Sequence, residues 1–156
     1  MIILGIDPGL RGALAFYDTA EKTLVLEDMP IVQVFRNGKK KDEVSAQLLS
    51  HIIAENSPDR AFMERVNAMP GQGVSSVFSF GRSSGVVEGA LAAFDIPTTL
   101  ITPVAWMKEL GMRAGKDGSR ERAMQLFPAY ASLFGRKKDD GRSDAALIAW
   151  YGYKTG

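Results

Sequence analysis

The sequence predicts an α/β fold in which helices cover both faces of a central, mixed five-stranded sheet. Apolar runs of strand length recur at five places, and segments with the helical spacing of apolar residues lie between and after them. The chain has 156 residues, which suits one compact domain and leaves room for such a sheet. We therefore expect residues 1–156 to form a single α/β domain.

The first expected strand is the N-terminal apolar run, which ends at Asp7 before the breakers Pro8 and Gly9. The next two apolar runs are expected to form an antiparallel meander with it, and two later runs complete the sheet. In chain order these four runs are Ala13–Tyr17, Leu24–Met29, Arg60–Val66 and Thr98–Ile101.

Cap residues and apolar spacing predict the helices. Asn37 and Gly38 mark a turn, after which Asp42 is expected to cap a helix whose apolar face includes Leu48 and Ile52. The other helices are expected over Val77–Phe94, near Trp106, from Ser119 to about Pro128, and from about Gly141 to Tyr151.

A glycine stripe runs along the longest of these helices, at Gly81, Gly85 and Gly89. Each glycine costs about 1 kcal/mol of helix stability relative to alanine, and a stripe of them allows close backbone approach. Two interpretations stay open. The stripe packs on the sheet of its own chain, or it forms a contact between two copies.

Three acids stand at the ends of expected elements that are otherwise apolar. Asp7 and Glu64 end strands, and Asp144 begins the last helix. A carboxylate in such a place costs free energy unless something pairs with it, and a bound cation is one such partner. Each acid also has an ordinary structural interpretation: Asp7 as a turn cap, Glu64 as a solvated strand end, and Asp144 as first-turn charge. Their repetition favours convergence on a metal.

The composition narrows the kind of metal. The chain has no cysteine, and its one histidine, His51, lies in an expected helix away from the acids. A site made of oxygen ligands favours Mg²⁺, with Mn²⁺ as a substitute, over zinc or softer metals. Acids around two such ions suit phosphodiester hydrolysis, because one ion activates water and the other stabilises the leaving oxygen.

These residues resemble the RuvC-type Holliday-junction resolvases. The family's acidic motifs look like Gly5–Gly9, Met63–Glu64 and Asp144–Ala149 here. Its Thr-Pro element looks like Ile101–Pro103 followed by Trp106–Lys108. The resemblance implies an RNase H-like fold, a homodimer, and Mg²⁺-dependent nicking of four-way junctions and other branched DNA.

The match departs from the family pattern at the fourth acid. The family usually has an acid or histidine three residues before the last aspartate, and Gly141 stands there. Asp139 and Asp140 directly precede it, but on a helix only Asp140 shares a face with Asp144. The expected catalytic and metal-binding set is therefore Asp7, Glu64, Asp140 and Asp144.

A second departure concerns the DNA interface. Asn67 stands where the family often has an aromatic residue at the junction centre, and Met69 is the nearby candidate to replace it. Basic residues cluster after Trp106 and again before the last helix, where they are expected to contact phosphates. The expected DNA-binding residues are Asn67, Met69, Arg113, Lys116, Arg120, Lys137 and Lys138.

Other functional classes fit less well. An actin-like ATPase or sugar kinase also places an aspartate and glycines after its first strand, but it needs two such domains and more residues than this chain has. An RNase H-like RNA-processing nuclease or a non-catalytic nucleic-acid-binding protein remains the alternative. No uncharged run is long enough to span a bilayer, so we expect a cytoplasmic enzyme without a membrane partner.

Overall fold

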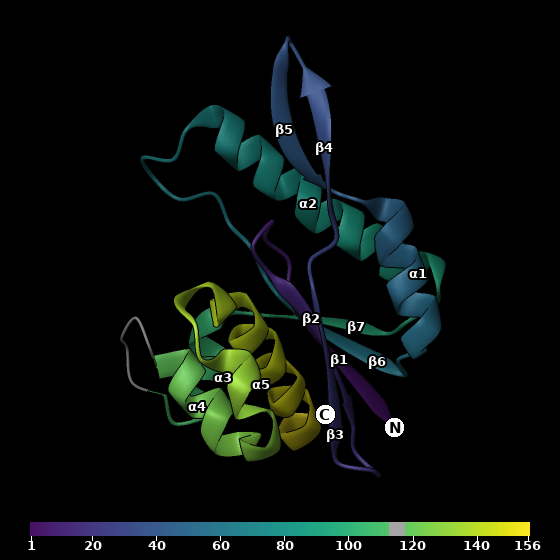
Figure 1. Cartoon of the computed structure of the whole chain (residues 1–156), viewed down its shortest axis with the longest axis vertical. Helices are drawn as coiled ribbons and strands as arrows, with labels where there is room; N and C mark the ends of the chain where they lie inside the picture. Colours follow the sequence, from purple (N-terminus) through teal and green to yellow (C-terminus); the bar gives the residue numbers. More distant parts are fainter. Residues whose placement is uncertain (113–117) are drawn as a thin grey trace.

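The main sheet of the protein has five strands in the order β3-β2-β1-β6-β7. The structure is a computed structural model that describes residues 1–112 and 118–156. The first three strands form an antiparallel meander, and the last two run parallel to β1 (Figure 1). The expected mixed five-stranded sheet is thus confirmed. The strands are β1 (Ile2–Asp7), β2 (Ala13–Asp18), β3 (Thr23–Asp28), β6 (Arg60–Glu64) and β7 (Thr98–Ile101).

One face of the sheet is covered by the C-terminal helices, which bury Trp106, Phe134 and Leu147 against it. The helix α5 lies directly on β1 at Gly5, where a Cβ atom would clash with the backbone of α5. The elements of this layer are α3 (Pro103–Glu109), α4 (Gly118–Leu126), the short 3-10 helices η1 (Pro128–Phe134) and η2 (Lys137–Asp139), and α5 (Asp140–Thr155).

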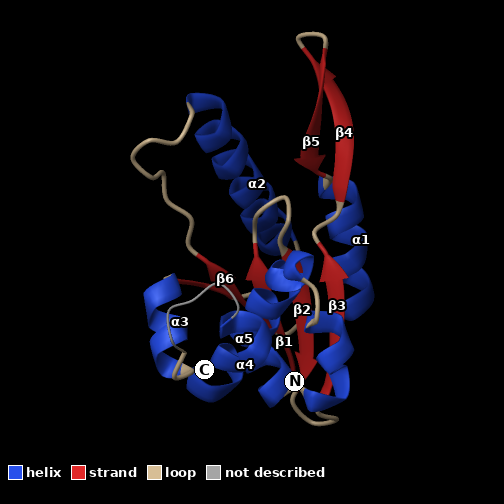
Figure 2. Ribbon diagram, turned by 60° about the vertical axis from the view of Figure 1, so that its left-hand side comes forward, coloured by secondary structure: helices blue, strands red, loops and turns tan. Residues whose placement is uncertain are grey.

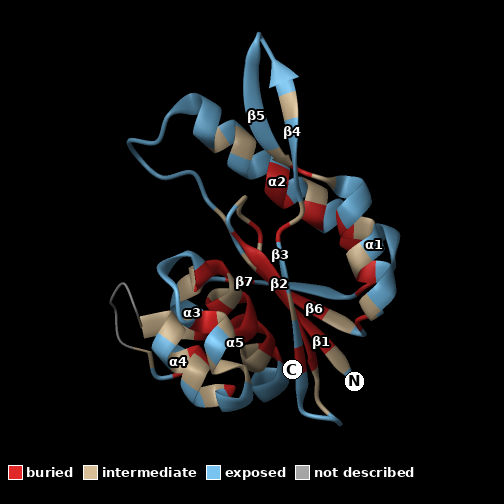
Figure 3. Ribbon diagram, in the orientation of Figure 1, coloured by how far each residue is buried: buried red, intermediate tan, exposed pale blue. Residues whose placement is uncertain are grey.

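The opposite face is covered by α1 (Ala46–Asn56) and α2 (Val74–Ala93). Their buried side chains, among them Leu49 and Leu91, pack on the apolar residues of β1 that point away from α5. Figure 3 shows buried residues concentrated where each helical layer meets the sheet. The prediction of helices on both faces is therefore confirmed. Within the described ranges, no helix combines the length and apolar character needed to cross a membrane.

The segment before α1 differs from the prediction. It forms a hairpin of β4 (Ile31–Arg36) and β5 (Lys39–Val44), which stands apart from the main sheet (Figure 2). The expected turn is present, because Asn37 and Gly38 both have positive φ, at 52° and 71°. Asp42, expected as a helix cap, lies in β5 instead. Ser45 caps the helix instead. Its hydroxyl accepts a hydrogen bond from the backbone N–H of Leu48, which satisfies one of the unpaired donors of the first turn.

The glycine stripe of α2 faces open space. Among the described residues, no atom outside the local helix backbone lies within 4 Å of a Cβ built at Gly81, Gly85 or Gly89. The interpretation that these glycines pack on their own sheet is therefore wrong. A smaller difference concerns Ser119, which was expected to cap a helix but lies within the first turn of α4.

Candidate active site

Two of the predicted acids meet at one edge of the sheet. β1 and β6 are parallel neighbours with Ile6 paired to Met63, so Asp7 and Glu64 follow side by side at the carboxyl ends of their strands. Because side chains alternate along a strand, both acids lie on the face that α5 covers. The Nε1 atom of Trp106, a buried residue of α3, donates a hydrogen bond of 2.9 Å to Oε2 of Glu64.

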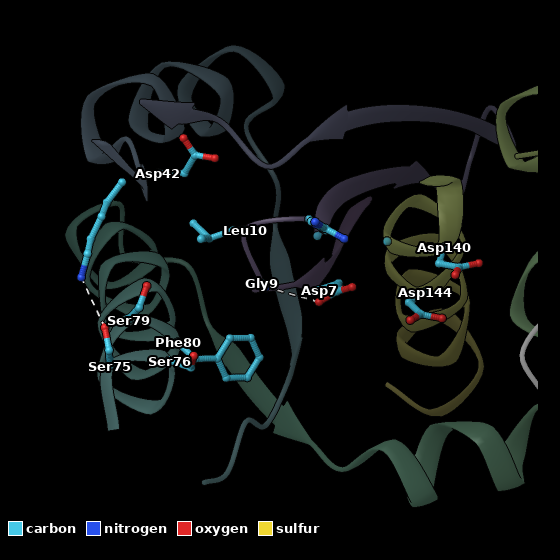
Figure 4. A pocket seen from close by; sticks show the side chains of 14 residues that line it. Asp7, Gly9, Leu10, Asp42, Ser75, Ser76, Ser79, Phe80, Asp140 and Asp144 are labelled. Carbon is cyan, nitrogen blue, oxygen red and sulfur yellow. Dashed lines mark hydrogen bonds between the residues drawn. The ribbon is translucent and has the colours of Figure 1, made fainter. Parts of the chain in front are cut away.

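The other two acids come from α5. Asp140 is its first residue and Asp144 lies one turn later on the same face. Figure 4 shows both carboxylates beside Asp7, on one side of a cleft of about 700 Å³. The opposite wall is formed by the α2 residues Ser75, Ser76, Ser79 and Phe80 together with Lys41 and Asp42 of the hairpin. The structure thus gathers acids from β1, β6 and α5.

The acids influence one another electrostatically. Burial, together with the Glu64 charge, raises the pKa of Asp7 to about 6, although a hydrogen bond from the Gly9 backbone opposes the shift. Burial also raises the pKa of Asp144 to about 7, and the charges of Asp7, Glu64 and Asp140 add to this rise. The pKa of Glu64 is raised by burial, with the Trp106 hydrogen bond acting against it. Burial is the main cause of these shifts, and mutual repulsion of the acids adds to it at Asp7 and Asp144.

The residues present suit a hard divalent cation. The acids offer carboxylate oxygens, and Oδ1 of Asp144 is buried without a hydrogen-bond partner among the described residues. In the described ranges, no three His, Cys, Asp or Glu side chains lie close enough together to hold an ion. Carboxylates that repel one another spread apart, so closer approach would accompany the binding of a cation.

The neighbouring acids Asp139 and Asp140 have different surroundings. The side chain of Asp139 is 1% exposed and accepts hydrogen bonds from the backbone and the guanidinium of Arg136, at 2.8 to 3.1 Å. These bonds hold the pKa of Asp139 below its usual range. Asp140 instead lines the cleft, where Nε of Arg120 lies 3.0 Å from its Oδ1 atom.

Gly141 explains why no acid stands at the position that the family pattern would give it. A Cβ atom at this residue would clash with the backbone of Arg11 and Gly12, in the loop that follows β1. The close contact between this loop and the start of α5 leaves no space for a side chain there. An acid on the cleft side of α5 can therefore precede Asp144 at position 140 but not at 141.

The expected DNA-binding residues lie around the cleft in different settings. Arg113 and Lys116 lie outside the described residues. Arg120 faces Asp140 and also donates a hydrogen bond of 3.0 Å to the Gly135 carbonyl. Lys137 and Lys138 are exposed on η2 and line a second recess, together with Arg11 and Arg136.

The loop between β6 and α2 holds the other two predicted residues. Asn67 lines a small depression that also includes Phe80, and the exposed Met69 lies further along the loop. Phe80 also lines the acidic cleft. The loop therefore stands at the rim of the site.

Sequence reasoning missed three residues at the site. The roles of Trp106 as a donor to Glu64, and of Ser119 as a donor to Asp144, depend on contacts between distant elements. Phe80 reaches the cleft only through the placement of α2. The Trp-Met-Lys segment was noted as part of a family element, but nothing in its spacing indicated a partner for the indole.

Comparison with solved structures identifies the fold. The Thermus thermophilus RuvC in complex with a Holliday junction substrate superposes with a TM-score of 0.65, over 99% of this chain and 96% of that one, at 13% identity. The chain has the fold of the RuvC resolvases. A second structure of Thermus thermophilus RuvC gives a TM-score of 0.60 at 14% identity, over 97% of this chain and 92% of that one. The resemblance stated from the motifs is confirmed.

Two further proteins extend the RuvC comparison. The yeast mitochondrial Holliday junction resolvase Ydc2 has a TM-score of 0.58 at 18% identity, over 96% of this chain and 76% of that one. The chloroplastic Holliday junction resolvase MOC1 of Chlamydomonas reinhardtii is 35% identical over 91 residues, which are 56% of this chain. That match spans 10% of the relative's length. No model of a protein family matches the chain.

Proposed function

We propose that this protein is a metal-dependent endonuclease that nicks four-way junctions and other branched DNA as a homodimer. The relatives named above are described as Holliday junction resolvases, and one is bound to a junction. The observation that carries the proposal is that Asp7, Asp140 and Asp144 line one cleft, with Glu64 at the end of the strand next to Asp7.

The four acids are proposed to hold Mg²⁺, or Mn²⁺ in its place. When bound, such ions supply an activated water and neutralise the charge that develops on the phosphate. Glu64 is oriented by the Trp106 indole, whereas Asp7 and Asp144 have raised pKa values that a nearby cation would lower. Arg120 stabilises the carboxylate of Asp140 next to the reacting phosphate.

The homodimer is proposed to form through the exposed face of α2. Val74 is 89% exposed and Phe78 is 73% exposed, and the glycine stripe continues their face along the helix. An apolar helix face that none of the described residues covers suits close packing against another copy. A two-fold dimer presents two acidic clefts to a four-way junction, whose symmetry it matches.

The proposal is tested by incubating the protein with labelled four-way junction, linear duplex and structured RNA, with Mg²⁺, Mn²⁺ or EDTA. We expect paired, symmetric nicks in the junction when metal is present, and ends that ligase reseals. Changing Asp7 to Asn, Glu64 to Gln, or Asp144 to Asn should abolish cleavage while junction binding stays equal or becomes tighter, because the amide keeps the shape and removes repulsion of phosphate.

Glu27→Gln is the matched control, since it removes an exposed acid on β3 outside the cleft. It should cleave as the parent does. Cleavage that survives Asp7→Asn would refute the two-metal proposal. Preferential cleavage of the RNA would instead favour the RNA-processing alternative, and binding without any cleavage would favour a non-catalytic role.

A further inference from the structure

The β4–β5 hairpin extends away from the body of the protein, beyond α2 (Figures 1 and 2). Six residues of each strand pair in full antiparallel register, from Ile31 opposite Val44 to Arg36 opposite Lys39. At about 3.3 Å per residue, each strand is roughly 20 Å long. Only Val44, at the base, is buried. A two-stranded hairpin with so little core is marginally stable alone, so its exposure needs an explanation.

One face of the hairpin secures it to α2. Arg36 and Glu43 form an ion pair of 2.6 Å across the strands, and Glu43 also lies 3.4 Å from a guanidinium nitrogen of Arg82 in α2. On the same face, Nζ of Lys41 lies 3.3 Å from the Ser75 hydroxyl. These contacts hold the lower half of the hairpin in place and fix the direction in which its other face points.

The other face, which we call the free face, consists of Ile31, Gln33, Phe35, Lys40 and Asp42, and it ends at the buried Val44 at the base. Phe35 is 72% exposed, and Nζ of Lys40 lies 5.9 Å from the centre of its ring. At the base of the hairpin, Asp42 lines the acidic cleft and Ile31 lines the basic recess of Lys137 and Lys138. The free face is therefore continuous with both hollows at the active site.

The tip of the hairpin carries a positive charge that its own chain does not neutralise. Arg36 is paired with Glu43, but neither Lys39 nor Lys40 has an acidic partner in the described ranges. An exposed aromatic ring beside Lys40, with Lys39 at the tip on the other face, gives the chain no packing energy, and on an open hairpin it favours aggregation. Rings next to cations are, however, the groups on which proteins stack nucleobases while holding the adjoining phosphates.

We propose that the hairpin is a DNA-binding arm, in which Lys39 and Lys40 contact phosphates and Phe35 stacks on a base that is unstacked at the branch. The inference rests on the proposed function, because the cleft beneath the arm is the proposed site of cleavage. The arm lengthens the surface that contacts a substrate entering this cleft, and it adds a preference for branched over perfectly paired DNA.

The test measures equilibrium binding with the non-cleaving Asp7→Asn protein as the parent. Substrates are a four-way junction and a perfectly paired duplex of the same length, each at several salt concentrations. The variants are Phe35→Ala, Phe35→Trp and the double change Lys39→Gln/Lys40→Gln. Phe94→Ala and Lys154→Gln are matched controls, because they remove an exposed phenylalanine and an exposed lysine far from the arm.

We expect Phe35→Ala to weaken junction binding roughly tenfold, near the lower end of what stacking on one base contributes, and to leave duplex binding unchanged. Phe35→Trp should bind as the parent does. The double lysine variant should weaken binding to both substrates and reduce the slope of binding against salt by about 2, one unit for each lost phosphate contact.

Junction binding within twofold of the parent for both Phe35→Ala and the lysine variant would overturn the inference. A parallel loss of dimer and of binding in sedimentation would also overturn it, since the arm would then pair with a second copy. If the parent binds no junction, the proposed function fails and this inference fails with it. If the parent binds the junction but the arm variants bind as tightly as the control variants, the arm inference is wrong and the proposed function stands.

Discussion

Nε1 of Trp106 donates a hydrogen bond of 2.9 Å to Oε2 of Glu64. The indole is fully buried at the start of the layer that contains α5, so its donor has a fixed position. An indole N–H cannot accept a proton or bind a cation, and the bond engages only one of the two oxygens of Glu64. The bond therefore sets the orientation of one proposed ligand without competing for the metal.

Trp106→Phe should preserve most of the packing and lose this bond. We expect Mn²⁺ affinity and cleavage to fall roughly 10- to 100-fold, the usual effect of removing a group that orients a metal ligand. Titration calorimetry with Mn²⁺ measures the affinity without catalysis. Trp150→Phe changes the chain's other tryptophan, whose ring contacts those of Tyr17 and Phe127 away from the acids, and it should leave metal affinity unchanged. Equal losses in both variants would indicate a general packing defect.

Asp139 and Asp140 should separate stability from activity. Asp140→Asn is expected to be inactive, because its side chain faces the cleft, and to lower the melting temperature only slightly, because its ion pair with Arg120 is half-exposed. Asp139→Asn should keep most activity and lose about 2 kcal/mol of unfolding free energy, since it weakens several charge-assisted hydrogen bonds to Arg136. Denaturant unfolding and junction cleavage measure the two effects. An inactive but fully stable Asp139→Asn protein would make Asp139 the ligand.

The acids of the cleft should make the metal-free protein less stable as the pH rises. The pKa of Asp7 is about 6 and that of Asp144 about 7 in the folded protein, above the ordinary value of 3.8. The folded state then binds more protons than the unfolded state between about pH 4 and 7, so this stabilisation is present below pH 4 and is lost by pH 7. In EDTA, the melting temperature should therefore fall across that range.

Mg²⁺ should offset this loss, and more so at pH 8 than at pH 5.5, because the cation binds the ionised acids. Differential scanning calorimetry with and without Mg²⁺ measures both effects. Asp7→Asn and Asp144→Asn should each flatten the dependence on pH, whereas Glu27→Gln should not. A Mg²⁺ effect of equal size at both pH values would contradict the assignment.

Gly85 offers a test of the proposed dimer, since in the part of the chain that the structure describes nothing beyond the local helix backbone lies within 4 Å of a Cβ built there. Gly85→Arg should not disturb the fold of one subunit, and it replaces a poor helix former. In a dimer that packs along the stripe, the same change separates the copies. We expect a monomer in sedimentation velocity, and single nicks in place of paired ones. Ala54→Arg, on the exposed side of α1, is the control. A Gly85→Arg protein that remains dimeric would place the interface elsewhere.

Local patterns in the sequence predicted most of the sheet and the positions of the acids. Apolar runs that end at breakers gave β1 and β7 almost to the residue, and the acid at the end of β1 marked the cleft. Helix spacing also separated Asp140 from Asp139, which the structure places in different surroundings. These features depend on neighbours within a few positions along the chain.

What could not be predicted depends on contacts between distant segments. In the β4–β5 hairpin, β4 is an apolar run but β5 is mostly charged, so the second strand carried no hydrophobic signal and the segment was interpreted as turn and helix. The Trp106–Glu64 bond joins residues 42 positions apart. The acid stands at 140 and not at 141 because Gly141 packs against the loop after β1, and this contact also joins distant segments.

The contact between α5 and β1 at Gly5 also affects which sequence changes the fold can accept during evolution. Because backbone meets backbone there, the spacing between the strand that carries Asp7 and the helix that carries Asp144 does not depend on the size of any side chain. Core residues on either side can be exchanged over many generations without moving the two carboxylates. Related proteins can thus share little overall sequence while a few glycines and acids keep the same geometry.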